Sequence, residues 1–158
     1  MKITKLDIEE IRESDIDALR PLVEEFVDTH RALPFREDYW AAFYAWCEKG
    51  LKDENTLFLS GKIADDLVGF IVGKIQENAP LMSPEYLGHV SILVVAKEHR
   101  GLGIGRALWE ELREWFLSKG ISYAELYTEA GNNISGPFWE NRGFEVFLEK
   151  RRKHIEKP

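Results

Sequence analysis

Residues 87–120 read LGHVSILVVAKEHRGLGIGRALWEELREWFLSKG and carry the most specific pattern in this chain. The β-branched, strongly apolar run at 87–96 predicts a strand. A glycine-rich turn at 99–106 follows it and opens into apolar residues at helical spacing, a helix that Gly120 is expected to end. The first turn of a helix presents unpaired N–H groups and the positive end of its dipole. This strand–turn–helix junction is therefore suited to hold a phosphate group.

Two common phosphate-binding motifs do not fit this turn. The dinucleotide pattern G-x-G-x-x-G would need glycine at position 106 or 108, where the chain has Arg106 and Leu108. The P-loop pattern needs G-K-[ST], a tripeptide that does not occur in the sequence. A glycine-rich connection without a ligand therefore stays an alternative at this point.

The spacing Arg100-x-x-Gly103-x-Gly105 resembles the pyrophosphate-binding signature of the GNAT superfamily, the acyl-CoA-dependent N-acetyltransferases. The family's second signature runs from an asparagine to a closing Gly-Phe and can be laid on NISGPFWENRGF at 133–144. The two motifs lie in the family's order, so the resemblance is specific over about 87–145. The matching positions of the second motif are Asn133, Phe138, Gly143 and Phe144.

The resemblance implies acetyl-CoA as the co-substrate, held in an opening between two central strands. Backbone groups of the strand before the turn would pair with the pantetheine arm, and the N–H of Val95 would face the thioester carbonyl as an oxyanion donor. Asn133 would bond the pantetheine arm, and Trp139 would lie beside it near the thiol. No metal is implied. The residues implied in cofactor binding are Leu93, Val94, Val95, Arg100, Gly101, Leu102, Gly103, Ile104, Gly105, Arg106, Asn133 and Trp139.

Acetyl transfer to an amine requires a proton acceptor, because an amine with a pKa near 10 is only about 0.1% neutral at pH 7. Family members often use a glutamate on the fourth or fifth strand. His89 stands where an acidic residue is common, and its ordinary pKa near 6.5 suits a base. Strict alternation would put His89 on one face with Ser91, Leu93 and Val95. Glu129, and with it Glu125, is an alternative base on the next strand or at its end.

Trp139 departs from the family pattern, because the usual tyrosine protonates the leaving thiolate and an indole cannot. Tyr127 is a candidate replacement for that acid. The departure also motivates a second hypothesis, a non-catalytic acyl-CoA-binding or sensing module. Cys47 lies within an aromatic stripe at helical spacing, so we expect it in the core and not as a nucleophile.

Hydrophobic periodicity predicts one α/β domain over 1–158, with a mixed central sheet and helices on both faces. The resemblance implies that this is the twisted sheet of a GNAT-like fold. The family usually has one more strand than this chain can supply, so that strand is expected to be missing or to come from a partner subunit in a homodimer. Ser14 or Asp15 is expected to cap the first helix, and Asn132 or Asn133 the last. The expected strands are 3–11, 56–60, 67–76, 87–96, 121–129 and 144–154, and the expected helices begin near 16, 39, 104 and 133.

The composition of the chain limits the classes of molecule that it is expected to bind. The chain has 158 residues with 21 basic and 28 acidic side chains, a net charge of −7, which argues against nucleic acid as a partner. It has one cysteine, no apolar run of about 20 residues and no secretory signal, which predicts a cytoplasmic protein that does not engage a membrane. The acceptor is expected to be a small-molecule or peptide amine, with a cationic one favoured by the surplus of carboxylates. The aromatic residues at 35–44 could line its site or simply be core.

Overall fold

The computed structural model describes residues 5–158, which form two compact units, one reaching to Tyr127 and the other spanning Thr128–Pro158. The first unit contains the whole sheet and three of the helices, and the second contains one short helix. The expectation of one domain over 1–158 stays a prediction.

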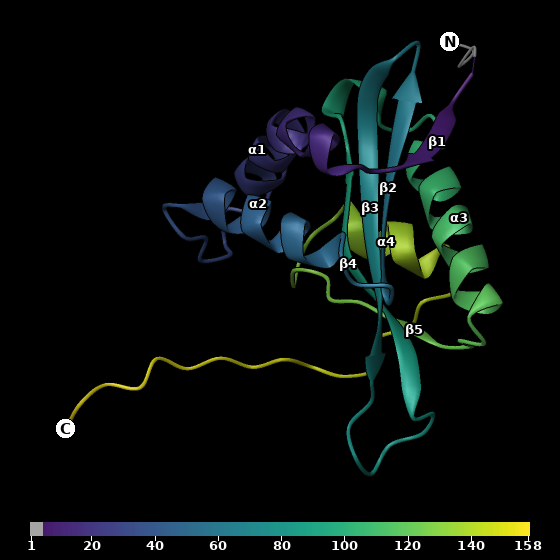
Figure 1. The fold of residues 1–158 in the computed structure, drawn as a ribbon. Helices are drawn as coiled ribbons and strands as arrows, with labels where there is room; N and C mark the ends of the chain where they lie inside the picture. Colours follow the sequence, from purple (N-terminus) through teal and green to yellow (C-terminus); the bar gives the residue numbers. More distant parts are fainter. Residues whose placement is uncertain (1–4) are drawn as a thin grey trace. The chain divides into compact units, whose positions relative to one another are not determined.

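The first unit is built on a five-stranded sheet in the order β1-β2-β3-β4-β5 (Figure 1). Neighbouring strands from β1 to β4 pair antiparallel, and β4 pairs parallel with β5, so the sheet is mixed as predicted. The strands are β1 (Asp7–Glu10), β2 (Thr56–Ile63), β3 (Asp66–Glu77), β4 (Tyr86–Val95) and β5 (Ala124–Glu125).

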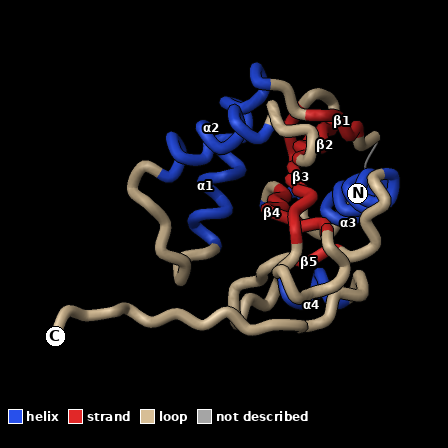
Figure 2. The backbone as a smooth tube through the Cα atoms, turned by 60° about the horizontal axis from the view of Figure 1, so that its bottom comes forward, coloured by secondary structure: helices blue, strands red, loops and turns tan. Residues whose placement is uncertain are grey.

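Helices cover both faces of this sheet, with α1 and α2 on one side and α3 on the other (Figures 1 and 2). Pro21 lies in the first turn of α1, where its missing N–H costs nothing. Gly120, with φ +76, ends α3 as predicted. The helical segments are η1 (Glu13–Leu19), α1 (Arg20–Thr29), α2 (Tyr39–Gly50), η2 (Lys97–His99), α3 (Ile104–Ser118) and, in the second unit, α4 (Ser135–Glu140).

The face toward α1 and α2 carries the larger core. Phe70 and Val72 of β3 are fully buried there, next to Phe58 of β2 and Val94 of β4. Cys47 of α2 is also fully buried in this cluster, as expected for a small core residue. The aromatic residues Tyr39, Trp40, Phe43 and Tyr44 pack against the same cluster, so the core interpretation holds for them.

The opposite face is lined with glycines that let α3 approach closely. A Cβ placed on Gly73 would lie 2.4 Å from Leu112 Cδ1, and one on Gly88 would lie 2.7 Å from the Phe116 ring. Both helix residues are buried, so neither can swing away into solvent. Small residues at these two strand positions therefore fix the distance between α3 and the sheet.

A β-bulge in β4 corrects one expectation about side-chain direction. Val72 pairs with Ile92 and the next residue, Gly73, pairs with Val90, which leaves Ser91 as an extra residue on β4. The expectation that His89 shares a face with Leu93 and Val95 is therefore wrong, because the bulge interrupts the period of two. His89 pairs with Lys74 and lies on the α1/α2 face, where Ser91 also lies, whereas Leu93 and Val95 follow Gly69 and Ile71 onto the α3 face.

Three expected strands differ from the structure. The segment 121–129 contributes only Ala124–Glu125 as β5. The predicted strand at 144–154 is not formed: residues 144–158 have no regular structure, and Val146, Phe147 and Leu148 are more than half exposed. Alternating apolar residues make a strand only where a neighbouring strand supplies hydrogen bonds, and in residues 5–158 none pairs with this segment. The first expected strand is shorter too, and its residues 3 and 4 lie outside the described residues.

Three of the four expected helix starts lie within two residues of the observed ones, which are Tyr39, Ile104 and Ser135. The expectation that Ser14 or Asp15 caps the first helix is wrong, because η1 begins at Glu13 and α1 begins only at Arg20. Arg12 is the residue before η1, and Asp15 closes a capping box there because Asp15 Oδ2 accepts the Arg12 N–H at 2.9 Å. In the second unit, Asn132 Oδ1 accepts the N–H groups of Ile134 and Ser135, both at 2.9 Å. Of the two candidate asparagines, Asn132 therefore caps α4.

Candidate active site

The central opening of the sheet lies between β4 and β5. These strands pair only at Gly88 with Ala124 and at His89 with Glu125, and the Gly88 N–H donates to the Tyr123 carbonyl at 2.9 Å. Beyond His89, the edge of β4 that faces away from β3 has no strand neighbour in the described part of the chain. An unpaired strand edge presents backbone donors and acceptors to an extended ligand.

The predicted segment 93–95 lies on this open edge. Val94 is 4% exposed in the core, and Leu93 and Val95 are half-buried, so all three side chains pack while their backbone borders the opening. The Ala96 N–H donates to the Val68 carbonyl at 2.8 Å, toward β3. Because donors alternate along an antiparallel pair, the Val95 N–H points to the open edge. This is the orientation that an oxyanion donor at Val95 would need.

The glycine turn follows directly from this edge. Gly101 and Gly103 have φ values of +77° and +85°, and a Cβ on either would meet no atom within 4 Å. The first hydrogen bond of α3 runs from the Ala107 N–H to the Gly103 carbonyl at 3.0 Å. None of the six backbone N–H groups from residue 101 to residue 106 donates to a described residue. The turn therefore gathers unpaired donors at a helix N-terminus, with open space in front of its glycines.

The two arginines that flank the turn differ in their contacts. Arg100 Nε donates to the Val95 carbonyl at 3.1 Å, which ties the turn back to the end of β4. Arg106 Nε forms an exposed ion pair with Glu110 Oε1 at 2.9 Å, one turn further along α3. An exposed pair of this kind contributes little stability, so Arg106 can exchange Glu110 for another anion at small cost.

His89 lies where the two strands diverge, at the closed end of the opening. It stands opposite Lys74 on β3 and beside Glu125 on β5, and its ring meets the Tyr127 ring edge-on with centroids 5.7 Å apart. Burial lowers the pKa of His89 below 6.5, with Glu125 raising it and Lys74 lowering it further. The imidazole is therefore neutral at pH 7 and able to accept a proton.

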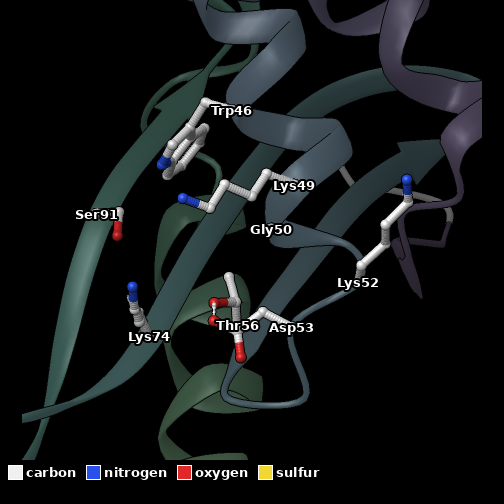
Figure 3. A pocket seen from close by; sticks show the side chains of 8 residues that line it. All are labelled: Trp46, Lys49, Gly50, Lys52, Asp53, Thr56, Lys74 and Ser91. Atoms are coloured by element: carbon white, nitrogen blue, oxygen red, sulfur yellow. Dashed lines mark hydrogen bonds between the residues drawn. The ribbon is translucent and has the colours of Figure 1, made fainter.

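A pocket of about 270 Å³ opens on the same face of the sheet as His89 (Figure 3). The last turn of α2 and the start of β2 form one wall, and β3 and the bulge of β4 form the floor. Its lining residues are Trp46, Lys49, Gly50, Lys52, Asp53, Thr56, Lys74 and Ser91. This pocket could not be predicted from the sequence, because only the strand register brings Lys74 and Ser91 beside the end of α2.

Comparison with known proteins settles the family. The chain matches the model of the acetyltransferase (GNAT) family over residues 19–144. This protein belongs to the GNAT acetyltransferase family. The match extends well before the two motifs, which resemble the family over about 87–145, and includes α1, α2 and the strands β2 and β3.

Solved structures share the GNAT fold with this chain at low identity. A transcriptional regulator from Bacillus halodurans C-125 superposes with a TM-score of 0.79 at 17% identity, covering 96% of this chain and 100% of that one. A ribosomal-protein-alanine N-acetyltransferase from Brucella melitensis biovar Abortus 2308 gives 0.72 at 18% identity, covering 96% and 99%. An aminoglycoside N-acetyltransferase solved in complex with CoA gives 0.74 at 18% identity, covering 98% and 95%. At these identities, the likeness shows the fold.

The remaining predicted residues of this GNAT protein lie in the second unit. Asn133 is exposed and Trp139 is 7% exposed, with the Trp139 ring meeting Phe138 and Phe144 edge-on at 4.9 and 5.1 Å. Glu129 is half-buried at the start of this unit, and its carbonyl accepts the Asn132 N–H at 3.0 Å. The roles of these three residues in cofactor binding and catalysis stay predictions.

The described residues contain neither a candidate metal site nor a membrane-spanning helix. In residues 5–158, no group of three or more His, Cys, Asp or Glu side chains is arranged to hold a metal ion. No helix in the same range is both long and apolar enough to cross a bilayer. The predictions of a cytoplasmic location and a homodimer stay predictions.

Proposed function

We propose that this GNAT protein transfers the acetyl group of acetyl-CoA to a primary amine by direct attack within a ternary complex. The observation that carries the proposal is the continuity of the open β4 edge with the six N–H groups of residues 101–106, none of which donates to a described residue. The first suits an extended, amide-bearing chain, and the second suits a pyrophosphate. CoA contains both groups in that order.

Each part of the cofactor has a matching part of the chain. The backbone of Leu93, Val94 and Val95 would pair with the pantetheine arm, with Asn133 and Trp139 assigned to the same arm by the family signature. The turn at 101–106 would hold the pyrophosphate through its N–H groups, and Arg106 would add a charge-assisted contact. Arg100 connects the turn to the end of β4, because its Nε donates to the Val95 carbonyl.

His89 is proposed as the general base. The attacking nitrogen forms a bond to the acetyl carbon, the bond from that carbon to sulfur breaks, and the amine proton passes to His89 Nε2 or Nδ1, directly or through water. The Val95 N–H would stabilise the negative charge that develops on the carbonyl oxygen, a kind of contact worth about 3 kcal/mol. Glu129 remains the alternative base, on the family resemblance alone.

The leaving thiolate needs no strong acid. A thiol has a pKa near 8.5, so its anion leaves readily without protonation in the same step. Tyr127 is 73% exposed and meets the His89 ring, which makes its hydroxyl the candidate to return a proton to sulfur. This arrangement would compensate for Trp139, whose indole cannot serve as the acid.

The departure at Trp139 supports a second candidate, an acyl-CoA-binding module without turnover. Such a module would use the same edge and turn but would release no CoA when an amine is added. Measuring free CoA thiol over a panel of amines separates the two candidates.

Binding of acetyl-CoA, measured by isothermal titration, tests the feature common to both candidates. In Gly103→Val, a β-branched residue is forced to φ +85° and its side chain projects into the open space before the turn. We expect at least a tenfold weaker affinity, because the isopropyl group would occupy the space in front of the turn that the pyrophosphate needs, and the strained backbone would displace the N–H donors of the turn.

Gly120→Val is the matched control. Gly120 has nearly the same φ, +76°, and equally open surroundings, but it lies at the far end of α3. Its backbone strain should lower stability without changing the affinity for acetyl-CoA. Equal affinities for wild type and Gly103→Val would mean that the turn does not hold the pyrophosphate.

A further inference from the structure

The pocket beside His89 contains two ammonium groups that face the same space. Figure 3 shows Lys49, from α2, and Lys74, from β3, extending toward the gap between Trp46 and Ser91, whereas the side chain of Lys52 points away from it. Thr56 and Ser91 add two hydroxyl groups to the lining. The indole of Trp46, 39% exposed, adds an apolar surface.

Among residues 5–158, no ion pair involves Lys49 or Lys74. The one carboxylate of the pocket, Asp53, is engaged elsewhere: its oxygens accept the Asn55 N–H and the Thr56 hydroxyl, both at 2.9 Å. These hydrogen bonds lower the pKa of Asp53, so it stays ionised, and it faces Lys49 and Lys74 without closing an ion pair with either.

The pocket is a local exception to the charge of the chain. The protein carries a net charge of −7, yet two lysines and one aspartate face this pocket, which gives it a formal charge of +1 when Lys52, whose side chain points away, is left out. Two ammonium groups that form no ion pair within residues 5–158 and the Ser91 hydroxyl are donors of the kind that a carboxylate or a phosphate requires, whereas the Thr56 hydroxyl is already donated to Asp53.

The position of the pocket relates it to the proposed chemistry. Lys74 and His89 are opposite one another on β3 and β4, so the pocket borders the candidate base. Ser91 precedes Leu93, the first residue of the segment proposed for pantetheine, by two positions, or about 7 Å of strand. A short acceptor could therefore present its amine at His89 while its other end lies in the pocket.

We propose that the acceptor of this enzyme is a small amine that also carries an anionic group, a carboxylate or a phosphate, which Lys49 and Lys74 bind. This proposal rests on the proposed N-acetyltransferase function and specifies its substrate class. Trp46 covers the carbon chain between the two ends of the acceptor. The proposal replaces the sequence-based expectation of a purely cationic acceptor, which considered total charge and not its distribution.

Three amines of equal chain length test the charge preference: δ-aminovalerate, pentylamine and cadaverine, whose far ends are anionic, neutral and cationic. Their reactive amino groups have similar basicity, so differences report the far end. Binding to the CoA-saturated protein is followed by NMR shifts of the Ser91 and Thr56 amides and the Trp46 indole N–H. Phosphoethanolamine and ethanolamine form a second pair that distinguishes a phosphate from a carboxylate.

We expect an anionic amine to bind about tenfold more tightly than its uncharged or cationic homologue, and this preference to vanish in the double variant Lys49→Gln/Lys74→Gln. Lys52→Gln removes the same kind of charge from a side chain that points away, and it should keep the preference. Equal binding of all the amines, tighter binding of cadaverine, or equal loss in Lys52→Gln would overturn the proposal.

The readout separates this proposal from the proposed function. Saturation with CoA is verified first by titration, so a failure to bind CoA counts against the proposed function and not against the anion site. If CoA binds and the anionic amines bind selectively but no acetyl group is transferred, the anion site stands and the enzymatic role fails.

Discussion

The two faces of the central sheet have different surroundings at Gly73 and Lys74, neighbouring residues of β3 that point to opposite faces. On one face, Gly73 lets the side chain of Leu112 lie against the strand, and the contact with α3 is dry and close. On the other face, Lys74 stands in a row with Thr56 and His89 at the edge of an open polar pocket. Adjacent positions thus serve packing on one side and chemistry on the other.

The bulge at Ser91 determines which side chains of β4 point to each face. Because it adds one residue to β4, the strand presents His89 to the polar face and Leu93 and Val95 to the packed face. The backbone edge that would bind the cofactor is thereby held firmly by packing, while the candidate base remains beside the pocket. A regular strand would have put His89 under α3, away from an acceptor.

Cys47 tests whether the core under α2 excludes solvent, and its rate of labelling by a thiol reagent should show the largest of the expected effects. Burial raises the pKa of Cys47 to about 12. At a pH near 8.5 an ordinary thiol is about half ionised, whereas this one would be ionised roughly one-thousandth as often. A thiol reagent should therefore label the native protein about a thousandfold more slowly than the denatured protein. Comparable labelling rates would mean that this half of the face is open as well.

His89 tests the chemical side of the comparison. His89→Gln keeps hydrogen-bonding capacity but cannot accept a proton, so we expect kcat/KM for acetylation to fall about a hundredfold. The pKa of His89 lies below 6.5, and the neutral form is the active one. The ratio of wild-type to variant rates should therefore rise with pH through a midpoint below 6.5 and level off above it. A ratio independent of pH would assign the base elsewhere, with Glu129 as the next residue to replace.

Gly73→Ala tests the packed side of the comparison. The added methyl group would overlap the buried Leu112 side chain at 2.4 Å, so we expect the free energy of unfolding to drop by about 2 kcal/mol in denaturant titrations. Gly61→Ala is the control on the same face of β2, because its Cβ would make ordinary contacts of 3.4 Å or more. The control should change stability by no more than about 0.5 kcal/mol. Equal effects would show that α3 does not press on Gly73.

Much of the fold could be predicted from local patterns. The apolar run ending at Val95, the glycine turn and the stripe of α3 are each complete in the sequence, and the structure confirms them in order. The segment from residue 144 could not be predicted in the same way. Its alternation of apolar residues is real, but whether it forms a strand depends on a neighbouring edge that periodicity does not reveal.

The candidate site was predictable in its backbone and not in its side chains. The open donors of residues 101–106 follow from glycine spacing and helix geometry. The direction of His89 depended on one inserted residue in β4, which no local pattern marked. Lys49 and Lys74 line one pocket because of the register between β2 and β3 and the position of the end of α2. That arrangement is a property of the assembled sheet.

The most direct test of the central claim is a turnover experiment with acetyl-CoA, in which free CoA thiol and N-acetylated product are quantified together over the amine panel. The account predicts that CoA release requires an amine, matches product one to one, and falls about a hundredfold in His89→Gln while acetyl-CoA affinity is unchanged. Tight binding of acetyl-CoA with no product from any amine would contradict it and identify the protein as a binding module.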